Sequence, residues 1–194
     1  MALLHGGASI TPNKLEVLAS WLPSRPWFTG DASALEAVGT YRFDDPDGEV
    51  GMETHLLRAG DSAIYQVPLT YRAAPLDGAD AFLLGTMEHT VLGRRWVYHA
   101  SVDPVYLAVL ADTIRTGGSQ AELRREFADG HTEIAEPTVR VVGSGASSAG
   151  PFELDVPSVL GGPLETPVGA DGGTLTGTWG GLDTPVLLAV ARPV

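Results

Sequence analysis

Cysteine is absent from this chain of 194 residues. Disulfide bonds, thiolate nucleophiles, iron–sulfur clusters and cysteine-ligated zinc sites are therefore excluded. A chain of this length buries roughly 70% of the surface that it exposes when unfolded. A hydrophobic core can thus hold the fold without covalent or metal cross-links.

Lysine is almost absent, because Lys14 is the only one in the sequence. A phosphate-binding Walker lysine or a Schiff-base lysine is excluded unless Lys14 takes that part. Positive charge is scarce in general: 24 acidic residues stand against 12 basic ones, which gives a net charge of −12. Such a surface repels phosphate backbones and anionic lipids, so we expect neither a nucleic-acid nor a membrane partner.

Long apolar runs are also missing, and none approaches the roughly 18 residues that span a bilayer. The segment MALLHGGASITPNK has no basic stretch ahead of an apolar one, so it does not resemble a secretion signal. We therefore expect a cytoplasmic protein.

Motifs for catalysis or metal binding do not occur. The five histidines include no pair at H-x-H or H-x-x-x-H spacing, and G-x-S-x-G is absent. The glycine-rich stretches 143–148 and 169–177 lack the G-x-G-x-x-G order, so they indicate turns. An acid pair from residues 44–53 would be needed for an enzyme, but DDPDGE is typical of a hairpin turn. We expect no metal, no cofactor and no catalysis by the chain alone.

Helix signals appear at four places. Thr11 and Pro12 predict the start of a first helix, which Pro23 ends. Asp103 and Pro104 begin the clearest helix, and Gly117 stops it. Its predicted inner stripe is Tyr106, Val109, Leu110, Thr113 and Ile114. A capping box at Ser119 predicts a third helix over 119–127, and 75–93 reads as a turn followed by a short helix.

Strand signals fill most of the remaining chain. Alternating patterns predict strands at 35–43, 50–57, 63–71, 94–100 and 138–145, and an almost continuously apolar one at 186–191. Pro68 predicts an edge or a bulge because it has no amide hydrogen to donate. The composition of 143–151 predicts a flexible linker.

The first three strands suggest a candidate site. Six side chains are predicted to share the polar face of one sheet: Arg42, Glu53, His55, Gln66, Thr70 and Arg72. This face is either a recognition surface for a sugar, an anion or a partner protein, or a solvated face with cross-strand charge pairs.

Several separate stretches resemble one family. They are TPNKLEVLASWLPSRPWFTG, DDPDGEVGMETHLL, YQVPLTYRAAPL, EHTVLGRRWVYHASVDPVY and RTGGSQAEL. Together they resemble the N-terminal cap region of bacterial maltokinases, over most of residues 1–145. The resemblance implies an α+β fold in which a curved antiparallel sheet packs on helices, as in cystatins. The full enzymes phosphorylate maltose with ATP and Mg²⁺, but their His-x-Asp loop and Asp-Phe-Gly metal motif have no counterpart here.

The tail carries a second resemblance. Residues 173–193, GTLTGTWGGLDTPVLLAVARP, resemble the first strands of a kinase N-lobe, with Ala189 where the ATP-clamping lysine stands and Arg192 after it. An unrelated hairpin is the alternative. The predicted division is a cap-like subdomain at 1–90 and a smaller β-rich, N-lobe-like subdomain at 91–194.

The resemblances imply two functions of different classes. One is a non-catalytic accessory protein that binds a kinase or another enzyme of maltose, trehalose or α-glucan metabolism. The alternative is a protein that binds a small sugar or sugar phosphate.

Overall fold

The computed structural model describes residues 2–5, 9–126, 131–146, 150–162, 169, 171–182 and 184–194. Within them lie two α-helices, α1 (Lys14–Trp21) and α2 (Pro104–Thr116). Short 3₁₀ turns are found at Leu22–Ser24, Ala32–Ala34, Asp80–Phe82 and Ala100–Val102.

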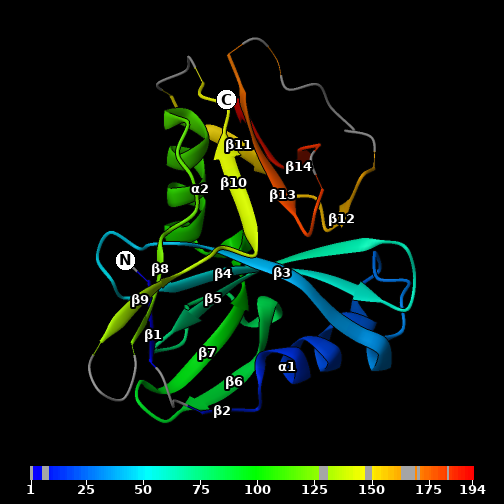
Figure 1. The fold of residues 1–194 in the computed structure, drawn as a ribbon, viewed down its shortest axis with the longest axis vertical. Coiled ribbons are helices and arrows are strands. Elements are labelled where there is room, and N and C mark those ends of the chain that lie inside the picture. Colours follow the sequence, from blue (N-terminus) through cyan, green and yellow to red (C-terminus); the bar gives the residue numbers. More distant parts are fainter. Residues whose placement is uncertain are drawn as a thin grey trace.

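The largest sheet is antiparallel and curved, with the strand order β2-β6-β7-β5-β4-β3 (Figure 1). The bounds of its strands are β2 Ile10–Thr11, β3 Leu35–Phe43, β4 Gly51–Ala59, β5 Ile64–Arg72, β6 Leu83–His89 and β7 Gly93–His99. A short strand, β12 (Val159–Leu160), pairs with the start of β5. This sheet with α1 is the first lobe, and its α+β character agrees with the predicted fold class.

A second antiparallel sheet has the order β10-β13-β14-β11. Its strands are β10 Val139–Gly143, β11 Phe152–Asp155, β13 Gly173–Trp179 and β14 Val186–Pro193. β14 is central, as its apolar sequence predicted. A third sheet joins β1 (Ala2–His5), β8 (Leu123–Glu126) and β9 (Thr132–Ala135).

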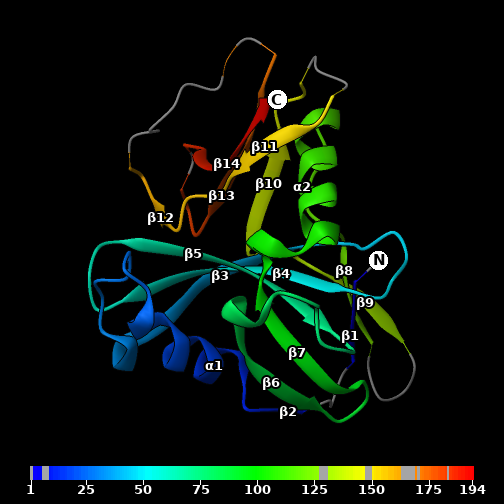
Figure 2. The same ribbon diagram turned by 180° about the vertical axis from the view of Figure 1, so that it is seen from behind.

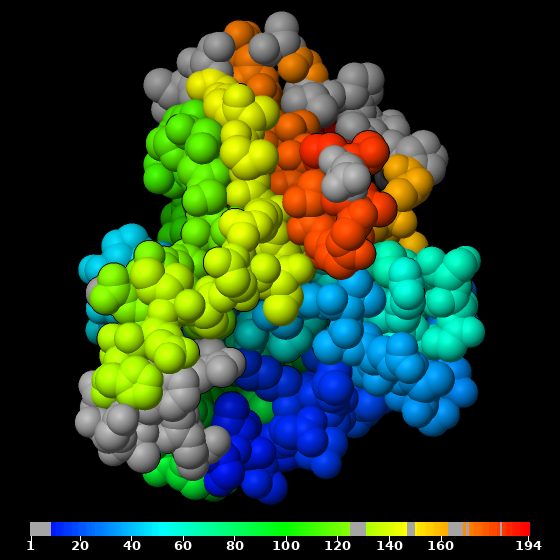
Figure 3. All heavy atoms as spheres, in the orientation of Figure 1, coloured from blue at the N-terminus to red at the C-terminus, as the bar shows by residue number. Residues whose placement is uncertain are grey.

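The first sheet is covered on both faces. α1 lies below it, while α2 and the second sheet stand above it, and the reverse view shows the same layers (Figures 1 and 2). We call these two sides the α1 face and the α2 face. In the space-filling view the region of α1, in blue, lies near the base, and the last strands, in orange and red, lie in the upper part (Figure 3).

Two hydrophobic cores correspond to the two faces. The core on the α1 face packs Leu18 and Leu22 against Tyr65 and Val67. The core on the α2 face contains side chains from three sources: Tyr41, Met52 and Leu56 of the first sheet, Tyr106 and Leu110 of α2, and Val139, Leu175 and Leu188 of the second sheet. α2 and the second sheet, which we call the second lobe, therefore pack their hydrophobic side chains in a core that they share with the first sheet.

The start of α1 differs from the prediction. Asn13, not Thr11, is the N-cap: its side chain accepts a hydrogen bond from the Glu16 amide at 3.0 Å, and its own amide donates to the Glu16 carboxylate at 2.7 Å. This reciprocal box satisfies two amides at the helix start. Thr11 instead pairs with Glu88 in the first sheet.

α2 confirms its prediction at both ends. The Asp103 carboxylate accepts from the Val105 amide at 3.0 Å, and Gly117 takes the left-handed conformation at φ 70°. Four residues of the predicted inner stripe are buried, namely Tyr106, Leu110, Thr113 and Ile114; Val109 is half-buried.

Two predicted helices are strands. The short helix predicted within 75–93 is wrong, because residues 83–89 form β6, which pairs with β7 along its length. The helix predicted over 119–127 is also wrong. Ser119 forms a bridge with Val142, and Leu123–Glu126 pairs with β1 and β9; residue 127 is outside the described residues. Pairing across the fold outweighed local propensity in both places.

Pro68 lies in the middle of β5 at a position that has no strand partner on one side among the described residues, which agrees with the predicted edge. On one side β5 pairs with β4; on the other, it pairs with β12 at its start and with β7 at its end. The Gln66 amide points to that second side, where it donates to the Ser158 carbonyl at 2.9 Å. Residues two apart face the same way, so the nitrogen of Pro68 faces the gap between β12 and β7. Its missing hydrogen therefore breaks no ladder bond.

The predicted boundaries also shift. A division after residue 90 falls in the turn between β6 and β7, so β7 belongs to the first sheet. The predicted linker at 143–151 begins as strand β10, and the amides of Ser144, Gly145 and Ala146 donate to the carbonyls of Thr174, Ile114 and Arg115. Residues 147–149 are outside the described residues.

Candidate functional site

The six predicted site residues do not share one face. In the register of β3, β4 and β5, Arg42 lies opposite Glu53, and His55 opposite Val67, on the α1 face. Gln66, Thr70 and Arg72 alternate onto the α2 face. The prediction of a common face is therefore wrong: the sheet separates the set into two groups of three.

The group on the α2 face joins the two lobes. Gln66 is fully buried; its side-chain amide donates to the carbonyls of Leu188 at 2.8 Å and Pro157 at 3.0 Å, and its oxygen accepts from the Tyr41 hydroxyl at 3.2 Å. Thr70 is also fully buried. The Gln66 amide thus ties the first sheet to the backbone of β14.

Arg72 binds the start of α2. Its guanidinium donates two hydrogen bonds to the Asp103 carboxylate, both at 2.7 Å. This bidentate arrangement is the strongest geometry for such a pair. Burial acts to raise the pKa of Asp103, but the bonds from Arg72 and the charge of Arg72 hold it below its ordinary value. Asp103 therefore caps α2 and anchors it to β5 at once.

The group on the α1 face is an ionic cluster around Glu53. The Lys14 ammonium contacts the Glu53 carboxylate and lies 5.5 Å from the centre of the Tyr71 ring. His55 Nε2 lies 3.5 Å from the same carboxylate oxygen and 3.3 Å from the Tyr71 hydroxyl. The single lysine of the chain thus forms a structural ion pair with Glu53.

Electrostatics keep this cluster charged although it is buried. Burial acts to raise the pKa of Glu53, but the hydrogen bond from His55 and the charges of His55, Lys14 and Arg42 hold it far below its ordinary value. Burial and the neighbouring carboxylate raise the pKa of Tyr71 well above its ordinary range. Glu53 is therefore an anion that does not serve as a general acid near neutral pH.

The exposed fraction of these six residues determines whether a ligand can reach them. Glu53, His55, Gln66 and Thr70 are each at most 7% exposed. The expectation of a solvated face is therefore wrong for them. A role of the six residues in binding stays a prediction; the contacts that they make hold the first sheet to its neighbours on both sides.

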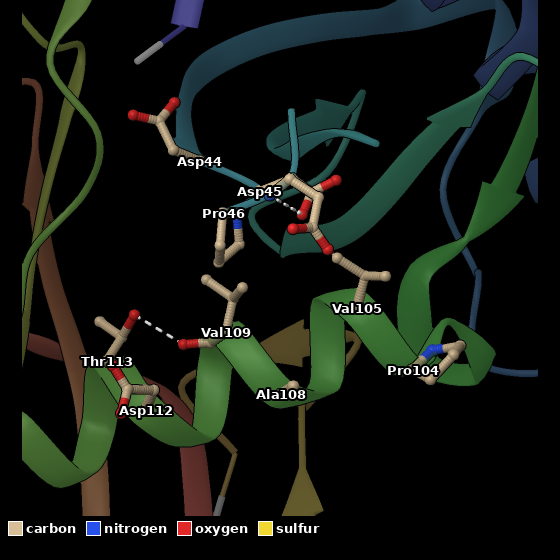
Figure 4. A pocket seen from close by; sticks show the side chains of 10 residues that line it. Asp44, Asp45, Pro46, Pro104, Val105, Ala108, Val109, Asp112 and Thr113 are labelled. Carbon is tan, nitrogen blue, oxygen red and sulfur yellow. Dashed lines mark hydrogen bonds between the residues drawn. The ribbon is translucent and has the colours of Figure 1, made fainter. Parts of the chain in front are cut away.

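A groove that no local sequence pattern predicted lies on the outer side of α2. It is open to solvent and has a volume of about 570 Å³ between the turn 44–47 and the helix (Figure 4). The helix residues that line it are Pro104, Val105, Ala108, Val109, Asp112 and Thr113. The hairpin-turn prediction for DDPDGE is consistent with this geometry, because the Asp45 carboxylate accepts bonds from the amides of residues 47, 49 and 50. The sequence features that could have indicated the groove are the acidic residues of the turn 44–47 and the apolar residues on the outer side of α2.

In the described part of the chain, no group of three or more His, Cys, Asp or Glu side chains is arranged to hold a metal ion. None of the described helices is long and apolar enough to cross a bilayer.

Residues 21–103 match the family model of the maltokinase N-terminal cap domain. This segment is therefore similar to that cap domain. The matched segment contains all six predicted site residues and ends at Asp103, the residue that caps α2. No curated protein matches the chain. The matched segment includes β3 to β7, whereas α2 and the second sheet lie beyond it.

Proposed function

We propose that this protein is a non-catalytic accessory protein that binds an enzyme of maltose, trehalose or α-glucan metabolism. The match of residues 21–103 to the cap domain carries the proposal. The polar residues of the cap support it, since Glu53, Gln66 and Asp103 are consumed in bonds within the fold. These polar side chains are therefore not available for catalysis, and the outer surface of the protein is left to bind a partner.

The second sheet supports the absence of kinase activity. Ala189, which takes the place of a nucleotide-clamping lysine in the resemblance, is 1% exposed. It lies opposite Leu175 of β13 and packs in the core shared with α2. A side chain at this place faces a hydrophobic interior and has no route to a nucleotide phosphate.

The proposal is tested by co-elution. The purified chain is mixed in turn with a maltokinase and with a maltosyltransferase, and each mixture is run on size-exclusion chromatography with light scattering. We expect a complex with one of them and no ATP turnover by the chain alone. If no pathway enzyme forms a complex, the accessory role is wrong; if the chain alone turns over ATP, its non-catalytic character is wrong.

A second candidate function is the binding of a small sugar. The volume of the groove beside α2, about 570 Å³, lies within the usual range of ligand pockets. Its carboxylates favour a neutral sugar over a sugar phosphate. A sugar at 100 times its Kd stabilises the fold by about 2.7 kcal/mol. Thermal melting with maltose, trehalose and their phosphates would show this as a raised Tm, and unchanged melting with every compound would reject it.

A further inference from the structure

The groove beside α2 is elongated. Its helix side consists of residues at i, i+1, i+4, i+5, i+8 and i+9, from Pro104 to Thr113. At about 1.5 Å per residue, this stripe runs for roughly 13 Å along the helix. The opposite side is the turn between β3 and β4, so the groove lies where the two lobes meet (Figures 1 and 4). This shape fits a length of polypeptide better than a compact molecule.

The floor of the groove is apolar. Val105 and Val109 are half-buried and point from α2 toward the turn that carries Pro46 (Figure 4). Ala108 is exposed between them and leaves room for a side chain from outside. Aliphatic side chains of a partner would gain burial here, at about 25 cal/mol for each Å² removed from water.

The rim of the groove is acidic. Asp47 and Asp112 are exposed on opposite sides of the floor, and Asp112 pairs with Arg115 at 2.8 Å. The Asp45 carboxylate, on the same turn as Asp47, accepts hydrogen bonds from backbone amides. A second copy of a chain with a net charge of −12 would bring like charge to this rim. A cationic partner is complementary to it.

We propose that this groove docks a basic amphipathic segment of another protein. Its aliphatic side chains would lie on Val105, Ala108 and Val109, and its lysine or arginine side chains would lie against Asp47 and Asp112. The proposal concerns this surface alone, so it holds or fails independently of the metabolic pathway.

The test uses three labelled peptides of equal length and measures fluorescence anisotropy with the full chain. The first carries leucines on one helical face flanked by lysines, the second has glutamates in place of the lysines, and the third has serines in place of the leucines. We expect only the first to bind, and its binding to weaken between ionic strengths of about 0.05 and 0.5 M because the charges are screened.

Variants locate the site. Ala108→Arg fills the floor of the groove and places a positive charge there that repels the lysine peptide. We therefore expect binding to be lost. The double variant Asp47→Asn/Asp112→Asn should weaken binding roughly threefold to tenfold at low salt. The matched control, Asp77→Asn/Asp80→Asn, removes the same charge around another exposed Asp-Gly turn and should change the affinity by less than about twofold. If Ala108→Arg lowers the Tm, the charge reversal Asp47→Lys/Asp112→Lys at exposed positions replaces it.

Four results would overturn the proposal. The first is no binding of the lysine peptide, and the second is equal binding of the glutamate peptide. The third is an equal loss of affinity in the control variant, which indicates diffuse charge. The fourth is another occupant: self-association of the wild type that Ala108→Arg abolishes, or displacement of the peptide by maltose.

Discussion

At the scale of the residue, the single lysine of the sequence has a structural role. Lys14 contacts the buried carboxylate of Glu53, while His55 and Tyr71 surround the same group. A buried charge without its partner is costly, because the desolvation penalty is no longer offset. The stability of the matched segment 21–103 therefore depends on a residue outside it.

Lys14→Met should destabilise the fold by about 1–3 kcal/mol in urea unfolding at neutral pH. The double variant Lys14→Met/Glu53→Gln should recover much of this loss, since it removes the stranded charge. Equal losses in the two variants would show that Lys14 acts through packing alone.

The acid sensitivity of the fold has the same origin. The folded-state pKa of Glu53 lies below its ordinary value of 4.5, so its stabilisation is present above that pH and is lost as the pH falls below it. Glu53→Gln should therefore show a flatter decline of unfolding free energy below about pH 4.5 than the wild type does. A parallel decline in both proteins would contradict this.

His99 gives a second, separate pH dependence. It stacks on Trp21 at 5.5 Å between ring centres, and burial together with the charge of Arg25 lowers its pKa to about 4. Its ordinary value is 6.5, so the unfolded chain takes up the proton first and stability falls as the pH drops from 6.5 toward 4. The loss amounts to up to roughly 3 kcal/mol.

His99→Phe keeps a ring beside Trp21 and removes the titration, so its unfolding free energy should vary less across this pH range. Ser101→Ala removes only the bond at 2.8 Å to the His99 ring and is the control. It should keep the pH dependence of the wild type. If the unfolding free energy of His99→Phe varies with pH as much as that of the wild type, His99 is not the source of this pH dependence.

At the scale of the element, α2 owes its position to close contact with two strands. A Cβ at Gly143 would lie 2.2 Å from the Thr113 carbonyl oxygen and 2.9 Å from the Ile114 Cα. Both atoms belong to the backbone of α2, so neither moves without moving the helix. A Cβ at Gly173 would meet the Ile114 side chain at 2.6 Å. Two glycines thus let the second sheet approach α2 closely.

Gly143→Ala should therefore destabilise the fold by about 1–3 kcal/mol or more, the range for overpacking. Gly162→Ala is the matched control, because no atom lies within 4 Å of a Cβ there. Its change should stay within about 0.5 kcal/mol. Urea unfolding measures both, and a small effect at Gly143 would mean that α2 can shift away.

At the scale of the whole molecule, the shared core makes the two lobes interdependent. Arg72 and Asp103 join β5 to α2, and Gln66 joins β5 to β14. The core on the α2 face takes side chains from both sheets. One face of the second sheet is therefore held against the core that it shares with α2 and the first sheet, which leaves the groove and the outer surfaces for a partner.

Ala189→Lys tests this view of the second sheet. A lysine there would bury an ammonium among Leu175 and other core side chains, which should cost several kcal/mol. We expect a strong fall in Tm and no ATP binding. Leu182→Lys places the same group at a position 41% exposed and should leave the Tm almost unchanged. A folded Ala189→Lys protein that binds ATP with Mg²⁺ would contradict the assignment.

The sequence by itself determined the elements whose signals are local. Asp103, Pro104 and Gly117 set the limits of α2, and alternation set β3, β4 and β5, because caps and the period of side chains act within a few residues. The family resemblance in these strands was likewise confirmed over residues 21–103.

Only the tertiary structure decided which residues meet. The polar side chains of β3 to β5 looked like one site, but the sheet divides them, and burial on both faces turned a predicted surface into internal contacts. β6 and β8 became strands because partners distant in sequence supply hydrogen bonds that a helix would otherwise supply itself. The groove depends on a turn and a helix about 60 residues apart, and no local pattern encodes that distance.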